Sequence, residues 1–278
     1  MKDDIKPKKK NKVLKVILLI VMLCALATLI YSGYKIVNWY IDNKKNEEIA
    51  IKMKDIADII EIPDTEQTEI VNPPENKFDP YWDYVNMDLM SVDFNELLNT
   101  NKNTVGWVKV EGTTINYPVV QGTNNEYYLN HSFDNSYNGS GWIFMDYRND
   151  SKNLNSNTII FGHSMRNKTM FHSLRNTLTN EWLNDNSKHI VKYSTPYENM
   201  LWQVFSVYTI EQESYYITPE FNNDEEYASW LEDMQKRSKK NFNTKVDTND
   251  KVLTLSSCYN TNGIRMVLHA KLIKKEAR

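Results

Sequence analysis

Short β-rich segments separated by turn residues dominate the chain from Val105 onward. Segments of this kind are expected to form strands at Val105–Val110, Thr114–Val119, Gly141–Met145, Thr158–Phe161, Ile190–Tyr193, Leu201–Ile210, Lys251–Cys258 and Arg265–Ile273. Glu111-Gly112 separates the first two, and Asn262-Gly263 separates the last two, which predicts a hairpin at each place. The number and even spacing of these strands predict a mainly β domain, either a barrel or a sandwich.

Helical periodicity interrupts this pattern at a few places. It is clearest at Asp224–Ser238, and shorter helices are expected at Asp93–Leu98 and Thr169–Leu174. The apolar residues that recur at helical spacing in the longest of these segments are Tyr227, Trp230, Leu231 and Met234. This helix is therefore inserted between two strands, ahead of the strand that ends at Cys258.

The N-terminal region has the pattern of a membrane anchor. Val16–Tyr34 is a 19-residue segment without a formal charge, and about 20 apolar residues cross a bilayer as a helix. Residues 1–15 carry seven Lys and two Asp, so the positive-inside rule predicts a cytoplasmic N-terminus and an exported remainder. The alternative is a cleaved signal peptide with Ala25-Leu26-Ala27 as its cleavage site; we rank it second, because the apolar run continues to Tyr31.

Residues 35–80 are predicted to connect the anchor to the folded domain. Within Asp42–Ile60, apolar residues recur at helical spacing, which fits either a short amphipathic stalk helix or a solvated, partly helical spacer. Glu61–Pro80 collects four prolines among acidic and amide residues, a composition typical of an extended linker. Folded structure is expected to begin near Tyr81, which gives a folded domain of residues 81–278.

The charge of the exported part argues against a nucleic-acid partner. The whole chain has a net charge of −3, and removing residues 1–15, with seven Lys and two Asp, leaves −8. Nucleic-acid binding domains are usually basic. Roughly 200 residues remain after the anchor and the linker, enough for one well-buried core.

Cys258 is the candidate for nucleophilic chemistry. It is the only cysteine outside the apolar N-terminal segment, where Cys24 lies, so an internal disulfide is not expected. A thiol needs a base or a cation nearby, and acyl transfer also needs a donor for the oxyanion. The predicted hairpin brings Arg265 beside Cys258, and His163 follows the β-rich segment Asn157–Gly162 at a polar rim.

Each of these residues alone has a more ordinary explanation. A lone cysteine is more often a small buried apolar residue, and a lone histidine or arginine more often serves structure or solubility. No zinc-ligand pattern, phosphate-binding loop, dinucleotide fingerprint or nucleophile-elbow motif is present, so neither a metal nor a cofactor is predicted.

Taken together, the motifs resemble the sortases, the cysteine transpeptidases of Gram-positive cell surfaces. The resemblance is carried by Thr254-Leu-Ser-Ser-Cys258 with a following arginine, and by Phe161-Gly-His163 upstream. It covers most of Trp107–Leu272 and is greatest for class B members. The segments most similar to class B are Gly106–Val110, Ile115–Gln121, Tyr127–His131, Phe144–Asn149 and the helix at Asp224–Ser238.

The resemblance implies an eight-stranded barrel with N-terminal helices. The implied enzyme cleaves a sorting pentapeptide of secreted proteins after Thr, forms a thioester, and passes the acyl group to a peptidoglycan amine. On this sequence, Cys258 would be the nucleophile, His163 the general acid or base, and Arg265 the group that stabilises the oxyanion and positions the substrate. Ser256, Asn125 and Leu129 would contact the sorting peptide.

The sequence departs from the family at two points. Ser257 stands where the family usually has threonine, and the connection from Cys258 to Arg265 is short. Two other hypotheses stay open beside the anchoring sortase. Asp79-Pro80-Tyr81 resembles the lid motif of pilus-polymerising class C sortases, although we expect the aromatic pair Tyr81-Trp82 to pack on the outside of the barrel. The third hypothesis is a membrane-tethered binding module without activity.

Overall fold

The computed structural model describes residues 10–258 and 263–278, and the side chains of Lys10, Asn11 and Cys258 are outside the description. The chain divides into two compact units, Met1–Lys44 and Lys45–Arg278. Helix α1, Lys10–Ile56, begins in the first unit and ends in the second. Among the described residues, α1 is the one helix that is long and apolar enough to cross a membrane. A signal sequence also meets these two criteria of length and composition.

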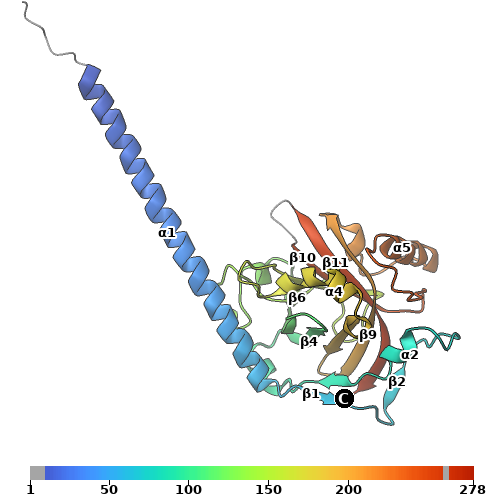
Figure 1. Ribbon diagram of the computed structural model, residues 1–278. Helices are drawn as coiled ribbons and strands as arrows, with labels where there is room; N and C mark the ends of the chain where they lie inside the picture. The colour runs from blue at the N-terminus through green and yellow to red at the C-terminus, as the bar shows by residue number, and fades with distance from the viewer. Residues whose placement is uncertain (1–9, 259–262) are drawn as a thin grey trace, which may run out of the picture. The chain divides into compact units, whose positions relative to one another are not determined.

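The second unit is built on a closed eight-stranded β-barrel (Figure 1). Around the barrel the strands follow the order β10-β7-β6-β5-β4-β8-β9-β11, and β11 pairs again with β10 to close it. The bounds are β4 Thr104–Val110, β5 Asn116–Gln121, β6 Phe144–Met145, β7 Asn157–Gly162, β8 Ile190–Ser194, β9 Glu198–Glu211, β10 Val252–Cys258 and β11 Ile264–Ala277. The pairs β5–β6 and β7–β10 are parallel, and the other pairs are antiparallel. The prediction of an eight-stranded barrel is confirmed.

Side chains alternate between the inside and the outside of the barrel. On β10, Leu253 and Leu255 belong to the main core cluster, whereas Val252 belongs to a second cluster under α5, Asp224–Lys236. That second cluster also contains Tyr227, Trp230, Leu231 and Met234 of the helix. Period-two alternation of this kind places one face of a strand in the core and the other under a covering helix. The long helix predicted from periodicity is confirmed, and it covers the outer face of β9, β10 and β11.

The shorter elements differ from the sequence prediction in detail. The strand expected at Gly141–Met145 is confined to β6, because Gly141 has a positive φ of 58° and Trp142 donates its backbone N–H to Tyr128. The helix expected at Thr169–Leu174 is a 3₁₀ helix, η2 at Phe171–Leu178, which starts after Met170 with φ of 56°. The remaining short elements are α3 Asn95–Thr100, α4 Asn180–Leu183, η1 Tyr127–Leu129, η3 Asn186–Lys188 and η4 Tyr215–Ile217.

The segment predicted as an extended linker takes part in the fold. Residues Ile60–Ile62 form β1, which pairs with β3 at Leu89–Ser91, and Thr68–Ile70 form β2, which pairs with β11. Glu61 contacts Lys192 and Lys109; burial alone would raise the pKa of Glu61, but these two ammonium groups lower it. The compact unit therefore begins before Tyr81, because pairing with distant strands outweighs the linker-like composition.

The end of α1 is likewise part of the compact unit. Ala50, Met53 and Ala57 are buried in the main core cluster, with Ile49 and Ile56 packed against it. Of the two alternatives for Asp42–Ile60, the amphipathic helix is therefore correct up to Ile56 and the solvated spacer is wrong. The helical spacing of the apolar residues arises because they face the barrel domain.

Tyr81 and Trp82 open a short helix outside the barrel, as expected. Helix α2 spans Tyr81–Tyr84, and its Tyr81 is fully buried in a cluster with Ile190, Leu201 and Ile273. The Tyr81 hydroxyl donates to the carbonyl oxygens of Val71 at 2.6 Å and Ile273 at 3.1 Å. Tyr81 thus fastens the segment before α2 to the barrel.

Replacing Tyr81 by phenylalanine tests this role. The change removes the Tyr81 donor from the carbonyl oxygen of Val71, whereas that of Ile273 keeps the backbone N–H of Val71, so we expect a loss of about 1 kcal/mol in the free energy of unfolding and a fall in Tm of roughly 2–4 °C. Tyr137→Phe is the matched control, because Tyr137 is 71% exposed and its Tm should not change. In a Cys24→Ser background, alkylation of Cys258 should proceed at the same rate in Tyr81→Phe. Unchanged stability would show that Tyr81 does not fasten this segment, and faster alkylation of a folded variant would indicate a lid.

Candidate active site

Three strand ends meet at one rim of the barrel. Cys258 is the last residue of β10 and is the register partner of Arg265 near the start of β11. On the other side of β10, Ser257 pairs with Gly162, the last residue of β7, and His163 follows directly. The predicted pairing of the two strands around Cys258 and Arg265 is confirmed. Four of the residues predicted to form the hairpin turn, 259–262, lie outside the described part of the chain.

A groove of about 410 Å³ lies at this rim. Five residues singled out from the sequence line it, namely Asn125, Leu129, His163, Ser256 and Arg265. The structure thus brings all of them together with the β10 end that carries Cys258. Eight further residues complete the described lining, namely Phe144, Phe161, Gly162, Gln212, Glu213, Tyr216, Ile217 and Ser257.

The His163 ring is held by a backbone carbonyl. Its Nε2 lies 2.9 Å from the carbonyl oxygen of Leu129. A carbonyl oxygen only accepts hydrogen bonds, so Nε2 must carry a proton in this arrangement. The bond therefore selects the Nε2–H tautomer of the neutral ring and leaves Nδ1 as the nitrogen that gains or loses a proton.

Arg265 is oriented by the loop that follows β9. Its Nη2 donates to Gln212 Oε1 at 2.9 Å. The adjacent Glu213 forms an ion pair with Arg237 at the end of α5. A guanidinium held in this way at a groove edge is suited to binding a carbonyl or carboxylate oxygen, because its charge is permanent and its donors are fixed in a plane.

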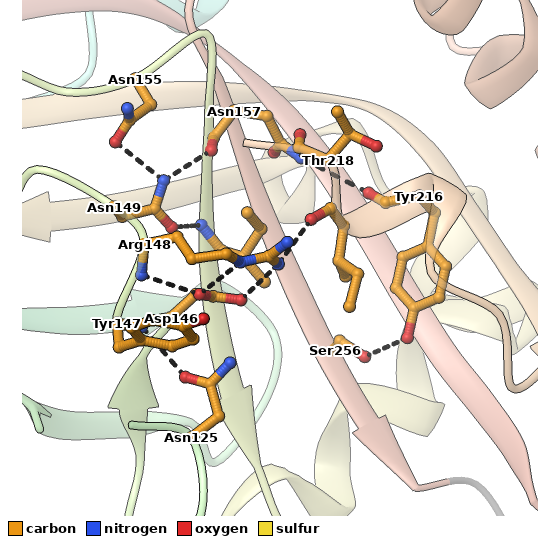
Figure 2. A network of polar contacts seen from close by, with 12 residues as sticks. Asn125, Asp146, Tyr147, Arg148, Asn149, Asn155, Asn157, Tyr216, Thr218 and Ser256 are labelled. Atoms are coloured by element: carbon orange, nitrogen blue, oxygen red, sulfur yellow. Dashed lines mark hydrogen bonds and ion pairs between the residues drawn. The ribbon is translucent and has the colours of Figure 1, made fainter. Parts of the chain in front are cut away.

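Polar contacts fasten the groove wall that contains η4 to the barrel (Figure 2). The Arg148 guanidinium makes two hydrogen bonds to the buried Asp146 and a third to the carbonyl oxygen of Ile217 at 2.9 Å. The Asn157 amide donates to the carbonyl oxygen of Thr218 at 3.0 Å. Two separate side chains thus hold the η4 segment against the barrel, so this wall of the groove is preformed.

Ser256 also contacts this wall. Its hydroxyl lies 2.9 Å from the Tyr216 hydroxyl, and both residues are buried (Figure 2). The neighbouring Ser257 has a buried hydroxyl with no hydrogen-bond partner within the described ranges.

A buried chain of polar side chains lies beneath β10. Thr254 Oγ1 donates to Asn157 Oδ1 at 2.6 Å and is 2.7 Å from His269 Nδ1, while His269 Nε2 is 2.9 Å from the Tyr208 hydroxyl. Because the Thr254 proton is used on Asn157, His269 donates from Nδ1 and accepts from Tyr208 at Nε2. Burial, with a smaller effect of Arg237, lowers the pKa of His269 to about 3, so this ring is neutral and structural.

The other histidines lie away from the groove lining. His189 is buried, and burial lowers its pKa to about 4. His172 lies 3.3 Å from the Ser164 hydroxyl, and burial also lowers its pKa. His131 stacks on Tyr127 with ring centroids 4.0 Å apart. Of the five histidines, His163 is the one found among the described lining residues.

Sequence reasoning missed the wall formed by residues 212–217. Gln212, Glu213, Tyr216 and Ile217 all line the groove, yet they lie in an irregular stretch between β9 and α5 with no periodic pattern. The polar and aromatic composition of this connection was the available signal. Within the described ranges, no group of three or more His, Cys, Asp or Glu side chains could hold a metal ion.

Comparisons with known proteins agree with this geometry. Residues 108–273 match the sortase domain family, so the chain belongs to the sortase family. It is 34% identical to sortase B of Staphylococcus aureus over 94% of this chain and 98% of that protein. Among solved structures, sortase B of Bacillus anthracis in complex with AAEK1 gives a TM-score of 0.67 at 34% identity and covers 84% of this chain and 99% of that chain. A Staphylococcus aureus sortase B–substrate complex gives a TM-score of 0.61 at 38% identity and covers 65% of this chain and 84% of that chain.

The family and its class B relatives establish the type of enzyme. The chain is a cysteine transpeptidase of the class B type, and this family works in cell-wall anchoring. The resemblance inferred from the motifs around Cys258 and His163 is confirmed at the level of family and class.

Folding linkage at His269 provides a test of the buried polar chain. The unfolded state binds a proton below a pKa of about 6.5, whereas the folded state excludes it until about pH 3. The contribution of His269 to the free energy of unfolding is therefore complete above about pH 6.5. It falls on acidification by about 1.4 kcal/mol per pH unit. His189 adds to the loss between about pH 6.5 and 4.

Chemical denaturation at a series of pH values measures this slope. Between pH 4 and 6, the slope of the unfolding free energy against pH should be smaller in His269→Gln than in the unsubstituted chain, by the about 1.4 kcal/mol per pH unit that one proton contributes. This difference is expected whatever the stability of the variant at neutral pH. Carboxylates titrate equally in both proteins, so the difference isolates His269. Equal slopes in the two proteins would contradict a neutral, buried His269.

Proposed function

We propose that this chain is a membrane-anchored class B sortase that cleaves the sorting motif of exported proteins after Thr and joins the new acyl end to a peptidoglycan amine. The observation that carries the proposal is the convergence of the ends of β7, β10 and β11 at one groove. Cys258 and Arg265 are register partners there, and His163 follows the strand on the other side of Cys258.

The chemistry proposed for the groove is acyl transfer in two steps. The Cys258 thiolate attacks the carbonyl carbon of the sorting-motif Thr, and the guanidinium of Arg265 stabilises the negative charge on the carbonyl oxygen. His163 gives a proton to the leaving amine, so the peptide bond breaks and a thioester remains. The acceptor amine then attacks the thioester, its proton passes to His163, and the Cys258 thiolate is restored.

The lining of the groove fits an extended peptide with mixed side chains. Leu129, Phe144, Phe161 and Ile217 supply apolar surface, and polar groups alternate with them. Asn125 Oδ1 accepts from the backbone N–H of Tyr147 at 3.0 Å, so its amide nitrogen is the group suited to donate to a peptide carbonyl. We assign Asn125, Leu129 and Ser256 to contacts with the sorting peptide. The relative solved as a Staphylococcus aureus sortase B–substrate complex supports a substrate-binding role for this chain.

The membrane anchor is proposed from the first part of α1. Residues 16–34 carry no formal charge, and the lysine-rich residues 1–15 precede them. By the positive-inside rule, the N-terminus would be cytoplasmic and the barrel would face the cell wall. The substrates would then be exported proteins with a sorting motif, and the acceptor would be an amine of peptidoglycan or its precursor.

The pilus-polymerising alternative is not favoured. A lid would place the aromatic residue of Asp79-Pro80-Tyr81 over the groove. Instead, Tyr81 is buried in its own cluster with Ile190, Leu201 and Ile273, and the described groove lining includes none of the three motif residues. The relatives of the chain are also named sortase B. An inactive binding module would have no need of a reactive thiol at Cys258.

Substitution of the three proposed catalytic residues tests the reaction. Cys258→Ala should abolish peptide cleavage and acyl-enzyme formation, since no thioester can form. His163→Ala and Arg265→Ala should each lower kcat/KM by at least about 10²-fold, the usual cost of losing an acid–base or oxyanion group. Cleavage of a panel of fluorogenic sorting peptides and mass spectrometry of the trapped thioester measure these losses.

A matched control separates chemistry from folding. His172→Ala should keep near-normal turnover, because His172 lies outside the described lining of the groove. Circular dichroism should show that all variants are folded. Near-normal cleavage by Cys258→Ala would overturn the proposed mechanism, and slow alkylation of Cys258 in the unmodified enzyme would favour the binding module.

Surface labelling tests the orientation of the anchor. Phe78 is 95% exposed in the barrel unit, so Phe78→Cys in a Cys24→Ser, Cys258→Ala background provides one accessible thiol. A membrane-impermeant maleimide should label this thiol in intact, wall-stripped cells. Labelling that requires lysis of the membrane would mean that the orientation is reversed.

A further inference from the structure

The last part of α1 carries a buried asparagine whose amide nitrogen and amide oxygen both form hydrogen bonds. Asn46 is fully buried. Its Nδ2 donates to the carbonyl oxygen of Gly141 at 2.9 Å, and its Oδ1 accepts from the Ser132 hydroxyl. Both partners belong to residues 130–141, here called the η1–β6 loop. A buried amide with both groups satisfied fixes its partners, because breaking either bond leaves a buried polar group unpaired.

Gly141 in turn lies directly against the residue that holds His163. A Cβ atom at Gly141 would lie 2.7 Å from the carbonyl oxygen and 2.9 Å from the carbonyl carbon of Leu129. This close approach and the positive φ of 58° both require glycine. The position of the Gly141 backbone therefore determines where the Leu129 carbonyl can lie.

The Leu129 carbonyl completes the connection to His163. Its oxygen is the hydrogen-bond partner of His163 Nε2 at 2.9 Å. A displacement of Gly141 would move this acceptor, and the preference of the ring for the Nε2–H tautomer would be lost. Two residues, Gly141 and Leu129, thus connect the Asn46 side chain to the His163 ring.

The packing of α1 makes Asn46 a rigid attachment point. Ala50 and Met53, one and two turns further along the helix, are buried in the main core cluster. Lys45 Nζ donates to Ser136 Oγ at 2.7 Å on the same η1–β6 loop, but Lys45 is partly exposed. The buried contact through Asn46 is therefore the one that can transmit position to Leu129.

We propose that Asn46 is a positioning residue for His163, acting through Gly141 and the Leu129 carbonyl. Through this connection the same helix that carries the apolar N-terminal segment determines the tautomer and orientation of the catalytic ring. The inference rests on the proposed function in one respect only, that His163 takes part in the reaction. The predicted effect on the ring itself does not depend on turnover.

Kinetics of the full-length chain in detergent provide the first test. Asn46→Ala should lower kcat about tenfold, the effect of losing orientation worth roughly one hydrogen bond, with KM for the sorting peptide within about twofold. Ser132→Ala should have a smaller effect, because it leaves the bond from Asn46 to Gly141 in place. Lys45→Ala should turn over at the normal rate.

A spectroscopic measurement tests the ring directly. In protein labelled with ¹⁵N-histidine, long-range ¹H–¹⁵N spectra show which ring nitrogen carries the proton, and His163→Ala assigns the signals. The original chain should show the Nε2–H tautomer for neutral His163, and Asn46→Ala should show a mixture of tautomers. Met53→Ala controls for stability, since it should lower Tm without changing the tautomer.

The outcomes separate positioning from a general structural role. A fall in kcat with mixed tautomers in Asn46→Ala, but not in Met53→Ala, supports the proposal. Normal kcat with the Nε2–H tautomer in a folded Asn46→Ala overturns it, as does a loss of kcat that follows Tm equally in both variants. If the original chain cleaves no sorting peptide, the proposed function fails, while the tautomer spectra still decide the role of Asn46.

Discussion

The pairing of β10 with neighbours on both sides is the interaction on which the site depends. Its parallel pairing with β7 and its antiparallel pairing with β11 close the barrel. The same two ladders set the positions of His163, Cys258 and Arg265 relative to one another. A slip of one residue in either ladder would send alternate side chains to the opposite face. The geometry of the candidate active site is thus a consequence of strand register.

A second layer of polar contacts supports this register from outside the barrel. Thr254 of β10 and Asn157 of β7 share a hydrogen bond, and His269 joins Thr254 from β11. Asn157 also holds the backbone of Thr218 in the groove wall. One buried network therefore connects β7, β10 and β11 with the groove wall at residues 212–217. Polar groups in such a network favour one register because any other would leave them unpaired.

Features that depend on local sequence patterns were the ones best predicted from the sequence. Alternation along β10 and β11 and the Asn262-Gly263 pair predicted that Cys258 and Arg265 would be neighbours. The wall at residues 212–217 could not be predicted, because its shape is set by Arg148 and Asn157 from distant parts of the chain.

Contacts across the fold also explain why one connecting segment was misjudged and the other was left with two alternatives. The strand β2, Thr68–Ile70, is only three residues long and exists because β11 offers it an edge. The helical spacing around Met53 was visible, but the face of the domain that buries it was not. In both cases the partner lies far away in the sequence, where a local pattern contains no information.

The sequence order of the strands has a consequence for when the candidate site forms, because β10 and β11 come after the strands that they join. His163 is made about a hundred residues before its partners at the rim, and the barrel closes only when the last two strands add to β7 and β9. Contacts between such distant residues form late in folding. A chain that is only partly folded would hold β7, which His163 follows, without β10, which carries Cys258. The groove can therefore form only once β10 and β11 have joined the barrel, so a partly folded chain lacks the assembled candidate site.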